Sequence, residues 1–490
     1  MTKETIWDVM LIAPVGTRDV TLTDLSLLPN DELREAWNHA DSDLRTGAWK
    51  KGEVLLADLD RYLPALRFEI LGKAVRHVFT RHDRIDRLVL VATKQGDDVP
   101  ERYRKNDTHN LALVVKEYLK QDKELHQVGD RVKIMTVTGN PANYDGMRSF
   151  YRENLPGWIR NLSPEGTCYL EVTGGTAQMS TMLLLEGVSL LRARAVPLYV
   201  LEEMYMPQTL DVGRAMLVDS LQQTLQRDLE VYAYHAALRS ITAEERVLRP
   251  RMRYYDAVRA TLDAARHRLN LNLDAAQKAL FGADQGLPDP LAQRVLRLAS
   301  ELGPPSRTLP WRIAEVYHTA VIRRRTEAYA SFLGRIFRYQ EALLRYLCEV
   351  WGAQFSGEND AFIDRTWLTN RPDVADRLSQ ANVDLRKSVT RYTLDVLAQY
   401  LAQSAENETG LSWLKELAKF DELSKLRNQS VVAHGFAGIS ADLLAKKYSG
   451  GAEQIEEDMA GLLHEVLDVD ASTNPYDEIN DLCLKLAKGI

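Results

Sequence analysis

The sequence predicts an α/β domain with a mostly parallel sheet, followed by an all-α region that fills the rest of the chain. Three observations lead to this prediction. Short β-rich runs alternate with helical patterns over the first 205 residues, those runs are apolar throughout, and strand signals cease after Pro207. Alternating strands and helices are typical of crossover connections in parallel sheets, and strands covered on both faces are apolar along their whole length.

Five apolar runs are expected to form the strands of this sheet. They are residues 9–15, 88–93, 132–138, 168–172 and 197–201. Between some of them, residues 111–119 and 179–191 have the apolar spacing of helices. Each helix would then cross from one strand to the next over a face of the sheet.

The region after residue 207 is rich in Leu, Ala, Arg and Glu and has helical spacing. Two loop signals interrupt it, at residues 282–290 and 303–310. A chain of 490 residues also has the length of two to four domains at about 150 residues each. The expected division is an α/β domain at 1–205, a helical connector at 206–325 and a terminal helical bundle at 326–490.

Composition and charge limit the classes of function. The net charge of −7 argues against a protein that coats nucleic acid, so no stable DNA complex is expected, although a small basic cleft could handle single strands. Three widely spaced cysteines without a CxxC motif fit a reducing compartment. The first residues do not resemble a signal peptide, and no run reaches the ~20 apolar residues that span a bilayer. A cytoplasmic protein without membrane contact is expected.

The most distinctive motif is RNQSVVAHG at residues 427–435. The preceding residues 413–426 have the pattern of one helix, and Gly435 is a plausible helix stop. On a continuous helix, Arg427 and His434 would point the same way, about 10 Å apart along the axis. Because burying such groups unpaired is costly, their common face is expected to meet a symmetry mate or a substrate.

These residue types suit RNA cleavage without a metal ion. A base must take the proton of the ribose 2′-OH, a cation must stabilise the charged phosphate, and an acid must protonate the leaving 5′-oxygen. Histidine serves as acid or base near neutral pH, and arginine offers a fork of donors to phosphate oxygens. Asn428 could orient either group, and a two-fold axis would pair two such faces in one cleft.

The arginine–histidine spacing alone is not specific. Similar pairs occur elsewhere, for example Arg34 with His39, but only in the pair at Arg427 does Asn follow the arginine and Gly follow the histidine. The alternative to a catalytic pair is a solvated arginine and a histidine whose hydrogen bonds are satisfied within the fold, near a helix end.

Two glycine turns follow expected strands, VGTRD at residues 15–19 and TGGTAQM at residues 173–179. Ligands of open α/β sheets bind at the carboxyl ends of the strands, where glycine turns let backbone N–H groups approach a phosphate. Neither turn matches GxGxxG or a P-loop, and tight turns without a ligand are the alternative. The candidate ligand-binding residues are Gly16, Thr17, Lys94, Gly174, Gly175, Thr176 and Gln178.

With the TGGT turn and the distant RN…HG motif in this order, the chain resembles the CRISPR-associated CARF–HEPN ribonucleases of type III antiviral systems. Residues 474–479 are also similar to the last helix of HEPN domains. The resemblance implies a Rossmann-like CARF domain at 1–205, a connector at 206–325 and a HEPN domain at 326–490. It implies a homodimer that binds cyclic oligoadenylate across its CARF domains and then cuts single-stranded RNA, leaving a 2′,3′-cyclic phosphate.

The resemblance also assigns roles by motif. Arg427, Asn428 and His434 would be catalytic with no metal ion or other cofactor, and the glycine turns would bind the activator. Many relatives have Lys directly after GlyThr in the second turn, whereas this chain has Ala177 and Gln178. That form is more similar to members that bind cyclic hexa-adenylate, so the activator is expected to be a tetra- or hexa-adenylate ring. Some related CARF domains cleave their activator, a step in which Thr17 or Thr176 could take part.

Three other functions remain open. A metal-dependent nuclease commonly needs an Asp and a Glu-x-Lys, and no Glu-x-Lys occurs in this chain. A ligand-responsive regulator with a winged helix would need a basic recognition helix, but the last segment is acidic around Glu453 and Asp458. A partner-binding protein without nuclease activity is also compatible with the sequence.

Overall fold

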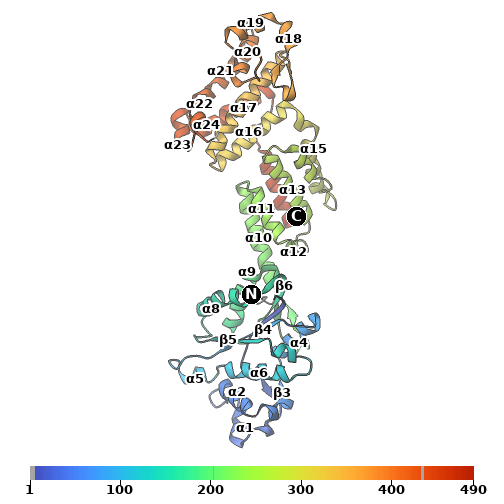
Figure 1. Ribbon diagram of the computed structural model, residues 1–490, viewed down its shortest axis with the longest axis vertical. Helices are drawn as coiled ribbons and strands as arrows, with labels where there is room; N and C mark the ends of the chain where they lie inside the picture. The colour runs from blue at the N-terminus through green and yellow to red at the C-terminus, as the bar shows by residue number, and fades with distance from the viewer. Residues whose placement is uncertain (1–5, 202, 432–434, 490) are drawn as a thin grey trace. The chain divides into compact units, whose positions relative to one another are not determined.

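The computed structural model describes residues 6–201, 203–431 and 435–489 (Figure 1). The chain divides into two compact units, residues 1–221 and 222–490. The boundary between the units falls within helix α10 (Val212–Glu230). The division into three segments at 205 and 325 stays a prediction.

A six-stranded sheet forms the centre of the first unit, in the order β5-β4-β1-β6-β7-β8. The first five strands are parallel, and β8 pairs antiparallel with β7 at the edge. All five predicted strands are confirmed. The strands are β1 (Trp7–Pro14), β4 (Arg87–Thr93), β5 (Val132–Val137), β6 (Leu162–Glu171), β7 (Ala195–Tyr199) and β8 (Gln208–Thr209).

Both faces of the sheet are covered by helices, as the apolar strands predicted. Alternate residues of β1 enter different cores, because successive side chains of a strand point to opposite faces. Leu11 packs in the core that includes α4 and α6, whereas Ile12 packs in the core that includes α8 and α9. These helices are α4 (Leu71–His82), α6 (His109–Gln121), α8 (Tyr144–Trp158) and α9 (Ala177–Leu191).

The strand order reverses direction between β1 and β6, the two central strands. From β1 the chain proceeds outward to β4 and β5, and from β6 it proceeds to β7 on the other side. A crevice forms at the carboxyl ends of strands at such a reversal, and it is where α/β sheets bind ligands. Both glycine turns follow these two strands, so the topology places them together at one edge.

Smaller elements complete the first unit. The short strands β2 (Thr21–Leu22) and β3 (Leu66–Arg67) form an antiparallel pair. The short helices are α1 (Asp31–Trp37), α2 (Ala48–Ala57), α3 (Leu59–Tyr62), α5 (Glu101–Arg104) and α7 (His126–Gly129).

The second unit is helical, with one two-residue antiparallel pair, β9 (Phe355–Ser356) and β10 (Phe362–Ile363). Its first helices are α11 (Tyr234–Ala243), α12 (Glu245–Leu248), α13 (Tyr255–Leu269), α14 (Leu273–Ala279), α15 (Asp289–Glu301) and α16 (Leu309–Arg325). Its later helices are α17 (Tyr329–Val350), α18 (Arg365–Thr369), α19 (Pro372–Gln380), α20 (Arg391–Ser404), α21 (Glu408–Ala418), α22 (Ser424–Gln429), α23 (Ala441–Lys447), α24 (Gly451–Leu467) and α25 (Pro475–Lys488).

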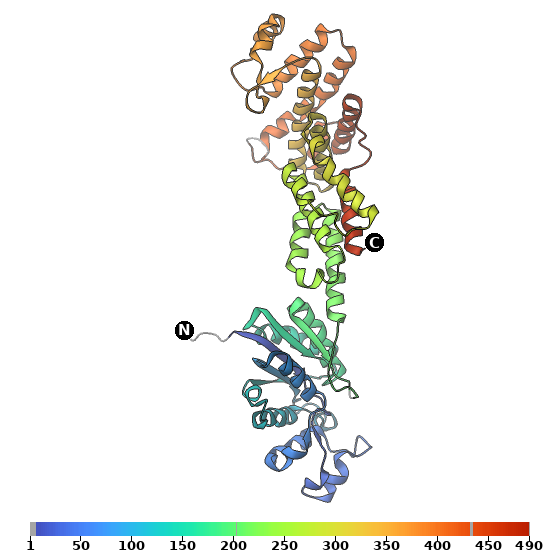
Figure 2. The same ribbon diagram turned by 90° about the vertical axis from the view of Figure 1, so that its right-hand side faces the viewer.

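The C-terminal helix α25 returns to the helices at the start of the second unit (Figure 2). It packs on α13 and α15. Arg294 of α15 donates to Asp481 at 2.7 Å, and the Tyr234 hydroxyl of α11 donates to Asn480 at 2.8 Å. Among the described residues, no helix is both long and apolar enough to cross a membrane.

Candidate functional site

A cavity of about 700 Å³ lies at the carboxyl edge of the sheet. We call it the sheet-edge cavity. Both glycine turns line it, together with the segments that follow β4 and β5. The residues that line the cavity include Gly16, Thr17, Gln95, Asn140, Gly175 and Thr176. Four of the seven residues predicted to bind a ligand therefore border one space.

The second glycine turn is fixed from several directions. Thr176 caps α9, since its Oγ1 accepts the N–H of Met179 at 3.2 Å, and the same hydroxyl donates to the Pro141 carbonyl at 2.5 Å. Gly175 has a φ of +75°, a conformation that glycine adopts without strain. The turn thus links the start of α9 to the segment after β5 and forms a rigid wall of the sheet-edge cavity.

The two glycine turns touch each other, which explains the need for glycine. A Cβ at Gly16 would lie 2.9 Å from the Gly175 nitrogen, and a Cβ at Gly174 would lie 2.4 Å from the Pro14 carbonyl oxygen. Either side chain would force the turns apart.

Replacing Gly174 with alanine is expected to lower the free energy of unfolding by about 1–3 kcal/mol, the usual effect of overpacking. Gly157→Ala is the matched control, because a Cβ there meets nothing within 4 Å in helix α8. Thermal unfolding of the two variants measures the difference. Equal melting temperatures for both would show that the turns have more room than described.

Two buried carboxylates accept hydrogen bonds from the backbone of the glycine turns. The Gly16 N–H donates to Asp19 Oδ2 at 2.5 Å, and Asp19 Oδ1 accepts the N–H of Leu71 at 3.2 Å. Glu171 accepts the N–H groups of Thr173 at 2.6 Å and Gly174 at 3.0 Å. The expectation that these glycine N–H groups face a phosphate is therefore wrong for Gly16 and Gly174, because both donate to carboxylates within the fold.

Burial changes the protonation of both carboxyl groups. Desolvation raises the pKa of Asp19 to about 6, against hydrogen bonds that favour the charged form. Desolvation, with repulsion from Asp19, raises the pKa of Glu171 to about 8. Sequence reasoning did not identify Glu171 as a site residue, and the available signal was a glutamate at the end of an otherwise apolar strand.

Lys94 and Gln178 do not line the sheet-edge cavity as the structure describes it. Lys94 borders a neighbouring cavity, where its Nζ lies 5.8 Å from the centre of the Trp49 ring. Gln178 is half-buried in the first turn of α9. Their assignment to the ligand stays a prediction.

The motif at residues 427–435 has a different local structure from the one expected. Residues 413–426 do not form a single helix, because α21 ends at Ala418 and a 3-10 turn (Lys419–Leu423) precedes α22. Helix α22 ends at Gln429, and Ser430 is extended with φ −96° and ψ 167°. The prediction that Arg427 and His434 share one helix face is therefore wrong. His434 itself lies outside the described residues.

The Arg427 side chain is held by two neighbours. Its guanidinium carbon lies 4.4 Å from the centre of the Phe337 ring of α17. Its Nε and Nη2 donate to Asn428 Oδ1 at 3.1 and 3.0 Å. A half-buried guanidinium on an aromatic ring, with one edge fixed by an amide oxygen, is a preorganised cation.

Gly435 closes the loop that follows α22. Its N–H donates to the Ser430 carbonyl at 3.1 Å, and the Ala437 N–H donates to the Gln429 carbonyl at 2.8 Å. A Cβ at Gly435 would lie 1.9 Å from the Gln429 oxygen, so the backbone itself occupies that space. The predicted role of Gly435 as a helix stop is wrong. Glycine is needed at this position because the backbone of Gln429 approaches so closely.

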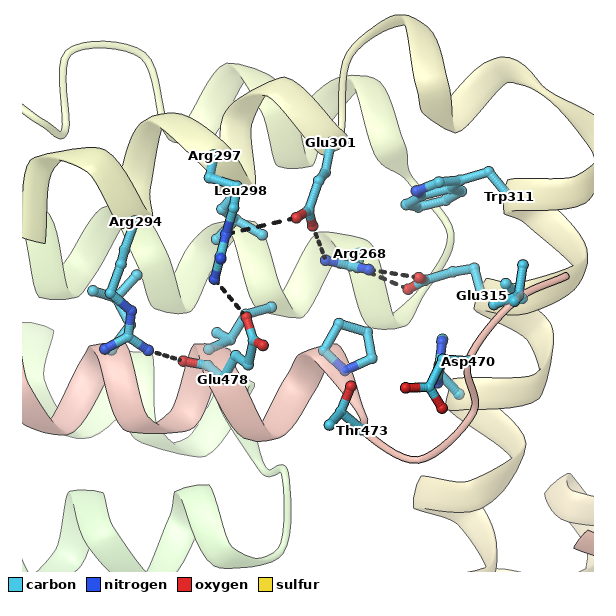
Figure 3. A pocket seen from close by; sticks show the side chains of 16 residues that line it. Arg268, Arg294, Arg297, Leu298, Glu301, Trp311, Glu315, Asp470, Thr473 and Glu478 are labelled. Atoms are coloured by element: carbon cyan, nitrogen blue, oxygen red, sulfur yellow. Dashed lines mark hydrogen bonds and ion pairs between the residues drawn. The ribbon is translucent and has the colours of Figure 1, made fainter. Parts of the chain in front are cut away.

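A second pocket, of about 300 Å³, lies in the second unit between α13, α15, α16 and α25 (Figure 3). Arg268 at its wall donates Nε and Nη2 to Glu315 at 2.9 and 2.8 Å, and Tyr476 donates to the same carboxylate at 2.5 Å. Both charged groups are almost fully buried. Burial also lowers the pKa of the nearby His318 to about 4. Together with Tyr476, this ion pair connects three helices, and it was not predicted from the sequence.

The fold and these sites define a class of protein: an α/β unit with a cavity at its sheet edge, joined to a helical unit with a preorganised arginine. No family model matches the chain, and no curated protein matches it. Among solved structures, the chain is similar to Enterococcus italicus Csm6 bound to cyclic hexa-2′-fluoro-hexa-dAMP. The TM-score is 0.59 at 14% identity, over 98% of this chain and 99% of that chain. The predicted fold class, and the resemblance to CARF–HEPN proteins at the level of the fold, are confirmed.

Proposed function

We propose that the chain is a metal-independent endoribonuclease that cuts single-stranded RNA when cyclic oligoadenylate binds its α/β unit. The observation that supports this most is the position of the sheet-edge cavity. It lies at the strand reversal of a fold shared over its whole length with Csm6, a protein solved with a cyclic hexa-adenylate analogue. The setting is type III CRISPR antiviral defence in the cytoplasm.

The sheet-edge cavity suits a nucleotide ring. Its lining offers neutral hydrogen-bonding groups, among them Thr17, Gln95, Asn140 and Thr176, and apolar side chains for bases. A ring of four or six adenylates has rotational symmetry, so a homodimer would bind it with two equivalent cavities. Ligand binding would shift the dimer between two states and so control the nuclease site in the second unit.

Arg427 supports the nuclease assignment. Its guanidinium, held by Phe337 and Asn428, would stabilise the negative charge that builds on the scissile phosphate. His434 would act as general base on the 2′-OH or as general acid on the leaving 5′-oxygen. Gly435, the next residue in the sequence, donates its N–H to the Ser430 carbonyl, just after the helix that carries Arg427. A second copy of the chain would complete the cleft.

A cleavage assay tests the proposal. Single-stranded RNA is incubated with the protein, with EDTA, and with cyclic tetra- or hexa-adenylate. Cleavage is expected to require a ring, to survive EDTA, to leave 2′,3′-cyclic phosphate ends and to disappear in His434→Ala. The control His464→Ala removes an exposed histidine of α24 and should cleave normally.

Three results would contradict parts of this function. Loss of activity with EDTA would refute the metal-independent chemistry. Full activity of His434→Ala would refute the catalytic site. Ring binding without any cleavage would favour the alternative, a ligand-responsive regulator or partner-binding protein.

A further inference from the structure

Asp19 and Glu171 lie close together behind the glycine turns that border the sheet-edge cavity. Both are fully buried. Asp19 Oδ2 and Glu171 Oε2 each lie 3.1 Å from the point where a Cβ would stand at Gly174, so the two oxygens border the same small space. Each carboxylate also accepts N–H groups from a glycine turn that forms the cavity wall. Neither carboxyl group lines the cavity itself, but each is hydrogen-bonded to the backbone of a glycine turn that does.

The surroundings offer this pair little positive charge. Arg18 is the cation that favours the ionised form of Asp19. On the other side, Tyr151 of α8 stays uncharged, because burial and the nearby Glu171 both raise its pKa. Of the residues found to line the sheet-edge cavity, none is Lys or Arg, and Asp107 adds another carboxylate. An anionic ligand in this cavity would therefore be repelled by the ionised carboxylates near it.

Burial raises the pKa of both carboxyl groups toward neutral pH. With pKa values of about 6 for Asp19 and about 8 for Glu171, the pair carries two protons below pH 6 and none well above pH 8. The two groups repel each other when both are charged, so the pair favours a state that keeps one proton. Near pH 7 the pair holds one proton.

We propose that Asp19 and Glu171 form a proton-binding site that is linked to the ligand in the sheet-edge cavity. A phosphodiester ligand then binds more tightly when both carboxyl groups are protonated, and its binding takes up protons. This inference rests on the proposed function, since it needs an anionic nucleotide in the cavity.

The direction of the effect follows from charge. A bound phosphodiester favours the neutral form of each carboxyl group, so its affinity is highest below pH 6 and falls as the pH rises through 8. Over about 10 Å at an effective dielectric constant of about 20, one charge shifts the pKa of another group by about one unit. With the pKa of each of the two carboxyl groups shifted by about one unit, the affinity for the ring is expected to fall about thirtyfold between pH 6 and pH 9.

Calorimetric titration of the full-length protein with cyclic tetra- and hexa-adenylate tests the inference. The Kd is measured from pH 5.5 to 9, each time in two buffers of different ionisation enthalpy, which reveals protons taken up on binding. Wild type is expected to take up protons between pH 6.5 and 8.5. Asp19→Asn and Glu171→Gln should each flatten the pH dependence and reduce the uptake. Asp24→Asn, which changes an exposed aspartate of the same unit, should behave as wild type.

The outcomes separate the inference from the function on which it rests. If neither ring binds at any pH, the proposed function fails. If a ring binds to wild type with no proton uptake and a constant Kd, the function stands and the linkage is wrong. Uptake that is undiminished in both carboxyl variants would also overturn the proposal, because the protons would then bind elsewhere. If one variant does not fold, the other still tests the assignment, and a wild type without proton uptake refutes the linkage by itself.

Discussion

The variant Arg427→Ala is expected to cleave RNA about a thousandfold more slowly than wild type while binding the activator ring with unchanged affinity. Removal of one preorganised donor to a developing anion typically lowers the rate by 10²–10³. Arg427 would supply both charge and a fork of donors. Single-turnover cleavage measured with saturating ring separates this loss from any change in RNA binding or activator binding.

Two variants sharpen the test of Arg427. Lysine at 427 keeps the charge but loses the planar fork that Asn428 holds, so Arg427→Lys should recover only part of the rate. Arg386→Ala, which changes an exposed arginine paired with Asp384 in the same unit, should cleave normally. A wild-type rate for Arg427→Ala would remove this residue from the nuclease site.

The second large effect concerns stability. Glu315→Ala is expected to lower the free energy of unfolding of the second unit by about 3–5 kcal/mol, because Arg268 would stay buried without its bidentate partner. The Tyr476 hydroxyl would lose its acceptor as well. The measurement is the urea midpoint of the unfolding transition.

Two controls distinguish loss of the buried pair from a general effect of losing a carboxylate. Glu453→Ala breaks an exposed ion pair with Arg324 and should change stability by about 1 kcal/mol or less. The double variant Arg268→Met/Glu315→Leu removes both charges and should be more stable than Glu315→Ala alone. If Glu315→Ala unfolds at the wild-type midpoint, the weaker ion pair of Arg268 with Glu301, at 3.8 Å, is sufficient to hold the guanidinium.

The α/β unit could be predicted well from the sequence, because its signals are local. Apolar runs mark the strands, and glycine turns follow β1 and β6. Parallel topology then brings these turns to one edge without further information. By contrast, Asp19 and Glu171 are far apart in the sequence. No local sequence pattern around either residue indicates that the two lie close together.

The helix around Trp413 shows why local patterns mislead. Its residues have helical propensity through Leu426, but Gln340 of α17 donates Nε2 to the carbonyl of Leu417 at 2.9 Å, where α21 ends. Phe420 and Leu423 in the following 3-10 turn are fully buried. Tertiary contacts with a distant helix therefore fix the break, and the sequence of the segment does not contain them.

The packing of α25 has a practical consequence for dissecting the protein. Its buried row, which includes Tyr476, Ile479 and Leu482, contacts helices that precede residue 326. A recombinant fragment that starts at 326 would leave this row facing water and would tend to aggregate during purification. A fragment that starts at 222 retains the partner helices and is the better choice for studying the helical unit in isolation.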